Sequence, residues 1–467
     1  MGANRLLALC LVWLALGSRS QAQDASPAPA QPPSTSTSQS SEPADSVSGK
    51  KEESSSRHSA HRIQVPVEDS QPTELTKAEA AIEKQDYATA EALLNKLVER
   101  EPASYVQWFD LGFVENALGK LDESIAAYRK SVAAKPDVFE SNLNLGLQLA
   151  KTGQPDAEKF LQAATHLKPS SHGAAGQYRA WLALGQTIEK AKPEQALRAL
   201  RQASALQPKE AEPHLSAAEL LEEENKFADA EQEYKQALAL DSQSSDAVIG
   251  LANIYMHGRR FPEAEDYLRR LLAEHADSAP VHIQLGRVLA AEGRLDDAAS
   301  ELQSGIKLAP GNDAAQRDLA DLYVSAGKND LAEASYRTLL AAHPNEAELH
   351  RRLGEALLPQ KKFTEAQQEF ATAIKLKPDL AEAYSGLAFA AGENKNYELV
   401  IRALDARAKL LPEVAITYFM RGSAYDHLHD FKKAAASYRL FLNSAHGKYP
   451  DQEWQAKHRL IAIEPKK

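Results

Sequence analysis

Hydrophobic residues beyond position 73 recur at intervals of three and four, which is the spacing of one face of an α-helix. In one segment, a first apolar stripe contains Leu319 and Tyr323, and a second stripe begins after Gly327. The second stripe stops at Pro344, which cannot continue a helix. The pattern therefore predicts two amphipathic helices in succession, separated by a glycine turn.

This two-helix pattern repeats with a period of 34 residues. One small residue of each first helix marks the period: Ala252, Gly286, Ala320, Gly354, Ala388 and Gly422. A second series follows twelve residues later: Ala264, Ala298, Ala332, Ala366, Val400 and Ala434, in which only Val400 is not alanine. A fixed period of this length indicates an array of stacked helical units. We count about eleven units, which start near residues 71, 105, 139, 178, 211, 245, 279, 313, 347, 381 and 415.

The repeat resembles the tetratricopeptide repeat. The family pattern appears in the second unit as Trp108, Leu111, Gly112, Tyr128 and Pro136, with Ser124 and Ser131 where alanines are usual. The resemblance implies an all-α fold, an α-solenoid of about eleven helix-turn-helix repeats wound into a right-handed superhelix. It also implies that the first helices line a concave groove, which binds other proteins or peptides and performs no catalysis.

The repeats do not run without interruption. Repeats one to three are expected at residues 73–169, and an insertion at 170–177 precedes repeats four to eleven at 178–448. We expect a bend or a break in the stack at that insertion. Residues 449–467 are expected to form a polar cap helix and a tail, because the last repeat of an array faces solvent.

The N-terminus has the pattern of a signal peptide covering residues 1–22. Arg5 precedes an apolar run at residues 6–16, which is too short to cross a bilayer about 30 Å thick. We expect cleavage after Ala22 and a periplasmic or secreted protein without a transmembrane segment. Two alternatives stay open: the segment is retained as an anchor, or Cys10 is lipidated.

Residues 23–72 are rich in Ser, Pro, Ala and charge and poor in aliphatic side chains, so we expect a disordered tether. Its two histidines, His58 and His61, are expected to be solvated, and a metal contact is the alternative reading of the pair. The chain beyond Ala22 has no cysteine, and no asparagine begins an Asn-x-Ser/Thr pattern for glycosylation. Together these absences favour a bacterial exported protein.

Composition and motifs favour a non-enzymatic role. The net charge of −11 argues against binding to nucleic acid. The sequence contains no phosphate-binding glycine loop, no nucleophile elbow and no His-Glu-x-x-His pair, so we expect no catalytic residue, no cofactor and no metal. His427 and His429 lie two residues apart, which directs their rings to different sides of a helix.

In the tetratricopeptide family, the fifth and ninth residues of each repeat contribute to the groove. By this resemblance, the expected apolar contacts to a partner come from Phe109, Phe113, Leu143, Leu147 and Leu182. Side chains of this kind form an anchor patch when they are exposed. The alternative is that neighbouring helices of a tightly curved stack bury them.

Arginines occupy the corresponding positions in the middle of the array: Arg287, Arg317 and Arg351. Such a row of guanidinium groups could bind a carboxylate of a partner. However, Asp321 follows Arg317 by one turn, and Glu355 follows Arg351 in the same way. This spacing favours pairs within each helix over a free polar groove.

These observations predict an exported, non-enzymatic scaffold that binds partner proteins or peptides in the groove of a repeat array. The alternative is a constitutive subunit of an envelope complex for secretion, pilus assembly or polysaccharide export.

Overall fold

The computed structural model describes residues 73–100, 103–171 and 173–464. The described residues form 23 α-helices and no β-strand, which confirms the all-α prediction. The expected signal peptide (1–22) and tether (23–72), with the predictions made for them, lie outside the described residues.

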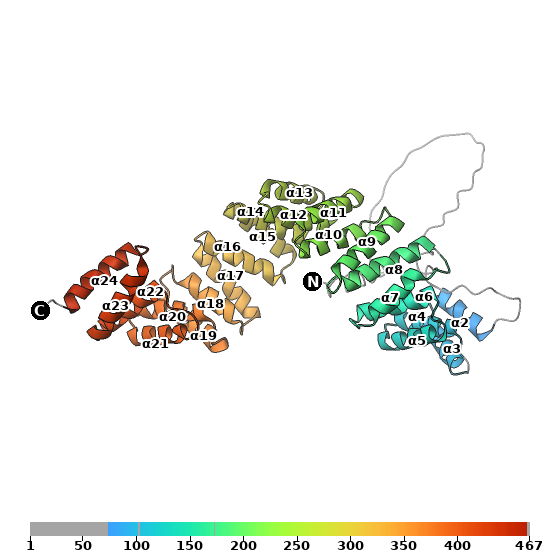
Figure 1. Ribbon diagram of the computed structural model, residues 1–467, viewed down its shortest axis with the longest axis horizontal. Coiled ribbons are helices and arrows are strands. Elements are labelled where there is room, and N and C mark those ends of the chain that lie inside the picture. Colours follow the sequence, from blue (N-terminus) through green and yellow to red (C-terminus); the bar gives the residue numbers. More distant parts are fainter. Residues whose placement is uncertain (1–72, 101–102, 172, 465–467) are drawn as a thin grey trace, which may run out of the picture. The chain divides into compact units, whose positions relative to one another are not determined.

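The chain divides into two compact units between Ser244 and Ser245. The first unit contains α2 (Glu74–Glu83), α3 (Tyr87–Val98), α4 (Tyr105–Ala117), α5 (Leu121–Ala134), α6 (Phe139–Lys151), α7 (Ala157–His166), α8 (Gly173–Ile188), α9 (Pro193–Leu206), α10 (Glu212–Glu223) and α11 (Phe227–Leu240). The second unit contains α12 (Ser245–His257), α13 (Phe261–Glu274), α14 (Ala279–Ala291), α15 (Leu295–Leu308), α16 (Asp313–Ser325), α17 (Asn329–Ala342), α18 (Ala347–Leu357), α19 (Phe363–Leu376), α20 (Ala381–Glu393), α21 (Tyr397–Ala408), α22 (Ala415–His427), α23 (Phe431–Ala445) and α24 (Pro450–Ile463). Within each unit the helices follow one another as pairs (Figure 1). The eleven pairs from α2 to α23 agree with the expected number of repeats.

The two helices of each pair approach most closely where a small residue of the first helix faces a large side chain of the second. A Cβ atom added to Gly112 in α4 would lie 3.0 Å from the ring of Tyr128 in α5. A Cβ atom added to Gly286 in α14 would lie only 2.7 Å from Cγ of Leu302 in α15. Other first helices carry fully buried alanines at the equivalent place: Ala252, Ala320 and Ala388. The 34-residue series of small residues is therefore a series of helix-helix contacts.

Phe370 extends this contact from one repeat to the next. Its ring is fully buried on α19 and lies against Gly354 of α18, the first helix of the same repeat. On the other side, a Cβ atom added to Gly386 of α20 would lie 2.3 Å from Cζ of the same ring. One aromatic side chain thus fills the space between three helices, and both glycines are needed to make that space.

The turn between the two helices of a pair depends on one residue in the left-handed conformation. Gly327 has a φ value of 70° there, which confirms the predicted glycine turn, and Gly119 makes the same turn with a φ value of 78°. Asn225 and Lys361 occupy the same turn with φ values of 58° and 60°. The repeat therefore imposes this turn even where no glycine is present to favour it.

A basic residue directly after this turn connects each of several repeats to the one before it. Lys120 contacts Glu91 at 2.6 Å, and Lys362 contacts Glu333 at 2.7 Å. Arg294 makes the equivalent contact to Glu265 at 2.9 Å. The basic side chains of these pairs are 39–44% exposed and the acidic ones 13–19% exposed, so each pair contributes about 1 kcal/mol and holds neighbouring repeats in register.

Two expectations about the ends of repeats need correction. The insertion at 170–177 does not break the stack, because α8 begins at Gly173 and contacts both α6 and α7. A bend at this place stays a prediction. The C-terminal cap helix, α24, is present, and it buries Ala456. Its outer face is not wholly polar, however, since Trp454 is 61% exposed and Ile461 is 71% exposed.

The packing around Phe370 predicts opposite effects for two glycines of α20. Gly386→Ala should lower the free energy of unfolding of the second unit by about 1–2 kcal/mol, because overpacking outweighs the gain in helix propensity. Gly392→Ala should be neutral or stabilising by up to about 1 kcal/mol, because its nearest neighbour would be Val400 Cγ2 at 3.7 Å. Urea unfolding of both variants measures the difference, and equal stabilities would contradict the packing argument.

Candidate protein-interaction surfaces

Two of the five apolar residues expected at the groove are buried. Phe109 is fully buried and packs against Tyr128 of the partner helix, with ring centroids 5.6 Å apart. Leu143 on α6 is fully buried as well. Their expected exposure is wrong, because the second helix of the repeat and the neighbouring repeats cover this side of the first helix. The alternative of burial holds for these two residues.

The other three expected contacts, Phe113, Leu147 and Leu182, are partly exposed. They come from α4, α6 and α8, and α6 and α8 contact each other directly. Phe113 also packs edge-on against Tyr87, with ring centroids 6.4 Å apart. We call these three residues the apolar face of the first unit.

Arg179 lies one turn before Leu182 on the same side of α8. It is partly buried, and among the described residues it makes no hydrogen bond and no ion pair. Burial lowers the pKa of its guanidinium below the usual value, with no opposing contribution from a carboxylate. Further along the same side of α8, Gln186 donates to Ser216 Oγ of α10 at 3.1 Å. Side chains on this side of α8 therefore point toward the next first helix.

Sequence reasoning missed Arg179, although a signal was present. The residues three and four places away on either side are Ala175, Gly176, Leu182 and Ala183, none of which can pair with a guanidinium. In the structure, Arg287, Arg317 and Arg351 in the middle of the array each pair with an acidic residue. Arg179 makes no such pair, although Glu210 and Glu212 stand at the start of the next repeat.

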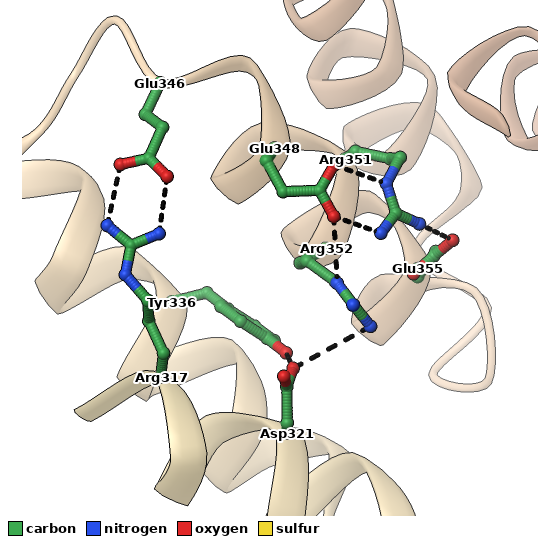
Figure 2. Close-up of polar contacts among 8 residues, drawn as sticks. All are labelled: Arg317, Asp321, Tyr336, Glu346, Glu348, Arg351, Arg352 and Glu355. Carbon is green, nitrogen blue, oxygen red and sulfur yellow. Dashed lines mark hydrogen bonds and ion pairs between the residues drawn. The ribbon is translucent and has the colours of Figure 1, made fainter. Parts of the chain in front are cut away.

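The expected polar groove of the second unit is an internally paired network. Arg287 of α14 donates from Nε to Asp318 of α16 at 2.6 Å. Arg317 of α16 forms a bidentate ion pair with Glu346, the residue just before α18 (Figure 2). Nη2 of Arg317 lies 2.7 Å from Oε2 of Glu346. These contacts join one repeat to the next. The hydrogen bond between Arg317 and Glu346 raises the pKa of Arg317 and lowers the pKa of Glu346.

Among the arginines of Figure 2, Arg351 has the least exposed side chain. It is only 8% exposed and donates to Glu348 and Glu355 on its own helix, with Nε 2.9 Å from Glu348. Glu348 also accepts from Arg352, which lies 3.8 Å from Asp321. The hydrogen bond from Arg351 holds the pKa of Glu348 below its usual value.

The pairing predicted within helices is confirmed for Arg351 and Glu355. It is wrong for Arg317, which pairs with Glu346 because that carboxylate meets both of its terminal nitrogens. Asp321 instead accepts from Tyr336 of α17. All three arginines expected to bind a partner are occupied, and this favours a structural role for them.

Glu115 is a second feature that sequence reasoning missed. It is 7% exposed on α4, and one of its carboxylate oxygens has no hydrogen-bond partner. Burial, together with Glu91 and Glu123, raises its pKa from 4.5 to about 7. The equivalent positions of other repeats carry apolar or aromatic residues, for example Leu289 and Tyr323, which is the signal that could have found it.

The described residues offer no metal site and no membrane span. They contain no group of three or more His, Cys, Asp or Glu side chains arranged to hold a metal ion. His427 stacks on Tyr397 with centroids 4.3 Å apart, while His429 lies in the turn with a φ of 62°. Over the same residues, no helix is both long enough and apolar enough to cross a bilayer.

Family models bear out the repeat identified from the sequence. One tetratricopeptide-repeat model matches residues 75–139, 188–245 and 317–381, and another matches residues 221–285. These segments of the chain therefore match the tetratricopeptide repeat, a class of repeat that generally serves as a scaffold for interactions between proteins.

Several solved structures are similar to the chain. YrrB, a tetratricopeptide-repeat protein with an unusual peptide-binding site, is 24% identical, with a TM-score of 0.35 over 40% of this chain and 96% of its own. Yeast Tom70 is 16% identical, with a TM-score of 0.33 over 84% of this chain and 95% of its own. MamA from Desulfovibrio magneticus RS-1 is 18% identical, with a TM-score of 0.33 over 35% of this chain and 92% of its own. No curated protein matches the chain.

The arginine network predicts a stability defect for Arg351→Met. The variant leaves Glu348 and Glu355 without their common donor, and it should lower the unfolding free energy by about 1–3 kcal/mol. Arg352→Met is the control, because that side chain is 42% exposed and should contribute less than about 1 kcal/mol. Urea unfolding at neutral pH compares them, and an equal effect of both variants would contradict a central role for Arg351.

Glu115 predicts a pH dependence of stability in the first unit. Its folded pKa is above the unfolded value, so the folded chain keeps a proton that the unfolded chain loses between about pH 4.5 and 7. The unfolding free energy should therefore fall as the pH rises through this range. Glu115→Gln should remove this contribution and raise stability above pH 7 by about 1–2 kcal/mol, after allowance for screening. Thermal unfolding at pH 5 and pH 8 tests this, and an unchanged pH profile would count against it.

Proposed function

We propose that the chain is a non-enzymatic scaffold whose first unit binds a peptide segment of a partner protein on the apolar face. The observation that supports this most directly is the position of Arg179, an unpaired and partly buried guanidinium one turn from the exposed side of Leu182. A desolvated cation without a partner is costly, and an incoming carboxylate would relieve that cost.

The apolar face and Arg179 together define the chemistry of the peptide. Phe113, Leu147 and Leu182 offer partly exposed apolar surface to leucine or aromatic side chains. Arg179 would receive a carboxylate from an acidic side chain or from a chain terminus. The second unit lacks an equivalent site, because Arg287, Arg317 and Arg351 are already paired within the described residues.

The setting of this function is also a proposal. We infer export to the periplasm or beyond, with cleavage after Ala22, from the charge and apolar pattern of residues 1–22. A constitutive subunit of a secretion, pilus or polysaccharide-export complex is the second candidate. Isolation of the chain from its own cells distinguishes the two, because a subunit co-purifies in a fixed complex and a recruiter does not.

A random peptide library with free carboxyl termini tests the peptide site. Peptides enriched on the full chain should combine leucine or phenylalanine with an acidic group. Arg179→Ala should weaken their binding about tenfold, because a hydrogen bond to a charged group contributes about 1.5–3 kcal/mol. Fluorescence anisotropy gives the dissociation constants.

Arg198→Ala is the matched control, because Arg198 is exposed on the second helix α9, away from the apolar face. It should leave binding unchanged, and circular dichroism should show that both variants keep their helices. The proposal fails if Arg179→Ala, and separately Leu147→Ala with Leu182→Ala, bind the enriched peptides as tightly as the native chain.

A further inference from the structure

Every second repeat in the middle of the array carries a histidine-glutamate pair with one geometry. The histidines His214, His282 and His350 are spaced by 68 residues, and so are their partners Glu233, Glu301 and Glu369. In each pair, Nδ1 of the ring lies 2.6–2.7 Å from a carboxylate oxygen on the second helix of the same repeat.

The opposite nitrogen of the ring reaches the preceding repeat. Nε2 of His282 lies 3.0 Å from the carbonyl oxygen of Ala276, which follows α13. Nε2 of His350 lies 3.0 Å from the carbonyl oxygen of Pro344, which follows α17. Each ring therefore connects the end of one repeat to both helices of the next.

The same carbonyl is contacted in three other repeats by side chains that carry a donor. Asn142 donates to the carbonyl of Pro136 at 2.8 Å, Gln316 to that of Pro310 at 2.7 Å, and Tyr384 to that of Pro378 at 3.1 Å. This hydrogen bond is thus a recurring joint between repeats. Histidine is the variant of the joint whose donors depend on pH.

Proton counting separates His282 and His350 from His214. A carbonyl and an ionised carboxylate only accept hydrogen bonds, so both nitrogens of His282 and of His350 must donate, which requires the charged imidazolium. A neutral ring would leave a lone pair facing one of the two acceptors. Nε2 of His214 instead meets the hydroxyl of Ser204 at 2.9 Å, which can donate or accept, so a neutral ring satisfies both contacts there.

We propose that His282 and His350 are pH-dependent joints that fasten neighbouring repeats of the second unit when they are protonated and loosen them when they are neutral. Glu301 of α15 faces Nδ1 of His282, and Nε2 meets the carbonyl oxygen of Ala276, which follows α13. For His350, the charged group is Glu369 of α19, and the end of α17 contributes the carbonyl of Pro344. The inference concerns the array itself and does not depend on the proposed peptide site.

The direction of the effect follows from the proton count. Each closed joint holds two donated protons, one more than the neutral ring of an unfolded chain carries. The stability that these joints contribute should therefore be greatest at low pH and decrease as the pH rises. Glu115 acts in the same direction in the first unit, so the test compares variants rather than the native profile alone.

The double variant His282→Gln with His350→Gln tests the joints in the full chain. Gln316 shows that glutamine makes the carbonyl contact at this position, so the variant should fold. The ratio of its unfolding constant to that of the native chain, from urea unfolding, should decrease about tenfold between pH 5 and pH 8. His214→Gln is the matched control, and its ratio should change less than about threefold.

A second variant, Glu301→Gln with Glu369→Gln, replaces the carboxylates by amides that can donate to a neutral ring or accept from a charged one. It should lose the same pH dependence, and hydrogen exchange of α14, α15, α18 and α19 at both pH values should place the change in these helices. The proposal is overturned if the ratio for the histidine double variant is the same at pH 5 and pH 8, or if His214→Gln changes as much.

Discussion

The close approach of the two helices in each repeat is the constraint on which the rest of the structure depends. A helical pair of this length cannot bury enough apolar surface alone, so it needs a tight internal contact and a neighbour on each side. The tight contact exists because Gly112 meets the ring of Tyr128, and because Gly354 and Gly386 enclose the ring of Phe370. A larger residue at any of these glycines would separate the helices and shift every contact further along the unit.

The same period that builds the core also distributes the charges. Lysines and arginines after the turn pair with acidic residues of the preceding repeat, as Lys120 does with Glu91. Groove arginines such as Arg317 pair with carboxylates of the following repeat. Paired charges of this kind hold neighbouring repeats in register and leave few unpaired charged groups to contact a partner protein. Arg179 stands out because it lies on the first helix of a repeat in the same array without such a pair.

Single departures from the repeat pattern carry most of the specific chemistry. Glu115 occupies a position where other repeats bury apolar or aromatic side chains, and its raised pKa is the physical result. His282 and His350 occupy the position from which Asn142, Gln316 and Tyr384 donate to the same carbonyl in three other repeats. In a repeat protein, such departures are visible in the sequence only after the repeats are aligned with one another.

The sequence by itself determined the helices, their pairing, the number of repeats and the role of the small residues. These follow from a hydrophobic period and from glycine and proline positions, which act locally and recur many times. The tertiary structure alone decided which groove residues are accessible, because Phe109 and Phe113 share one helix face and differ only in what the neighbouring helices cover. It also decided that Arg317 pairs with Glu346 instead of Asp321. A long side chain can reach acidic residues of its own helix and of adjacent repeats. Which one it pairs with depends on the distances between helices, and these cannot be read from the spacing of residues along one helix.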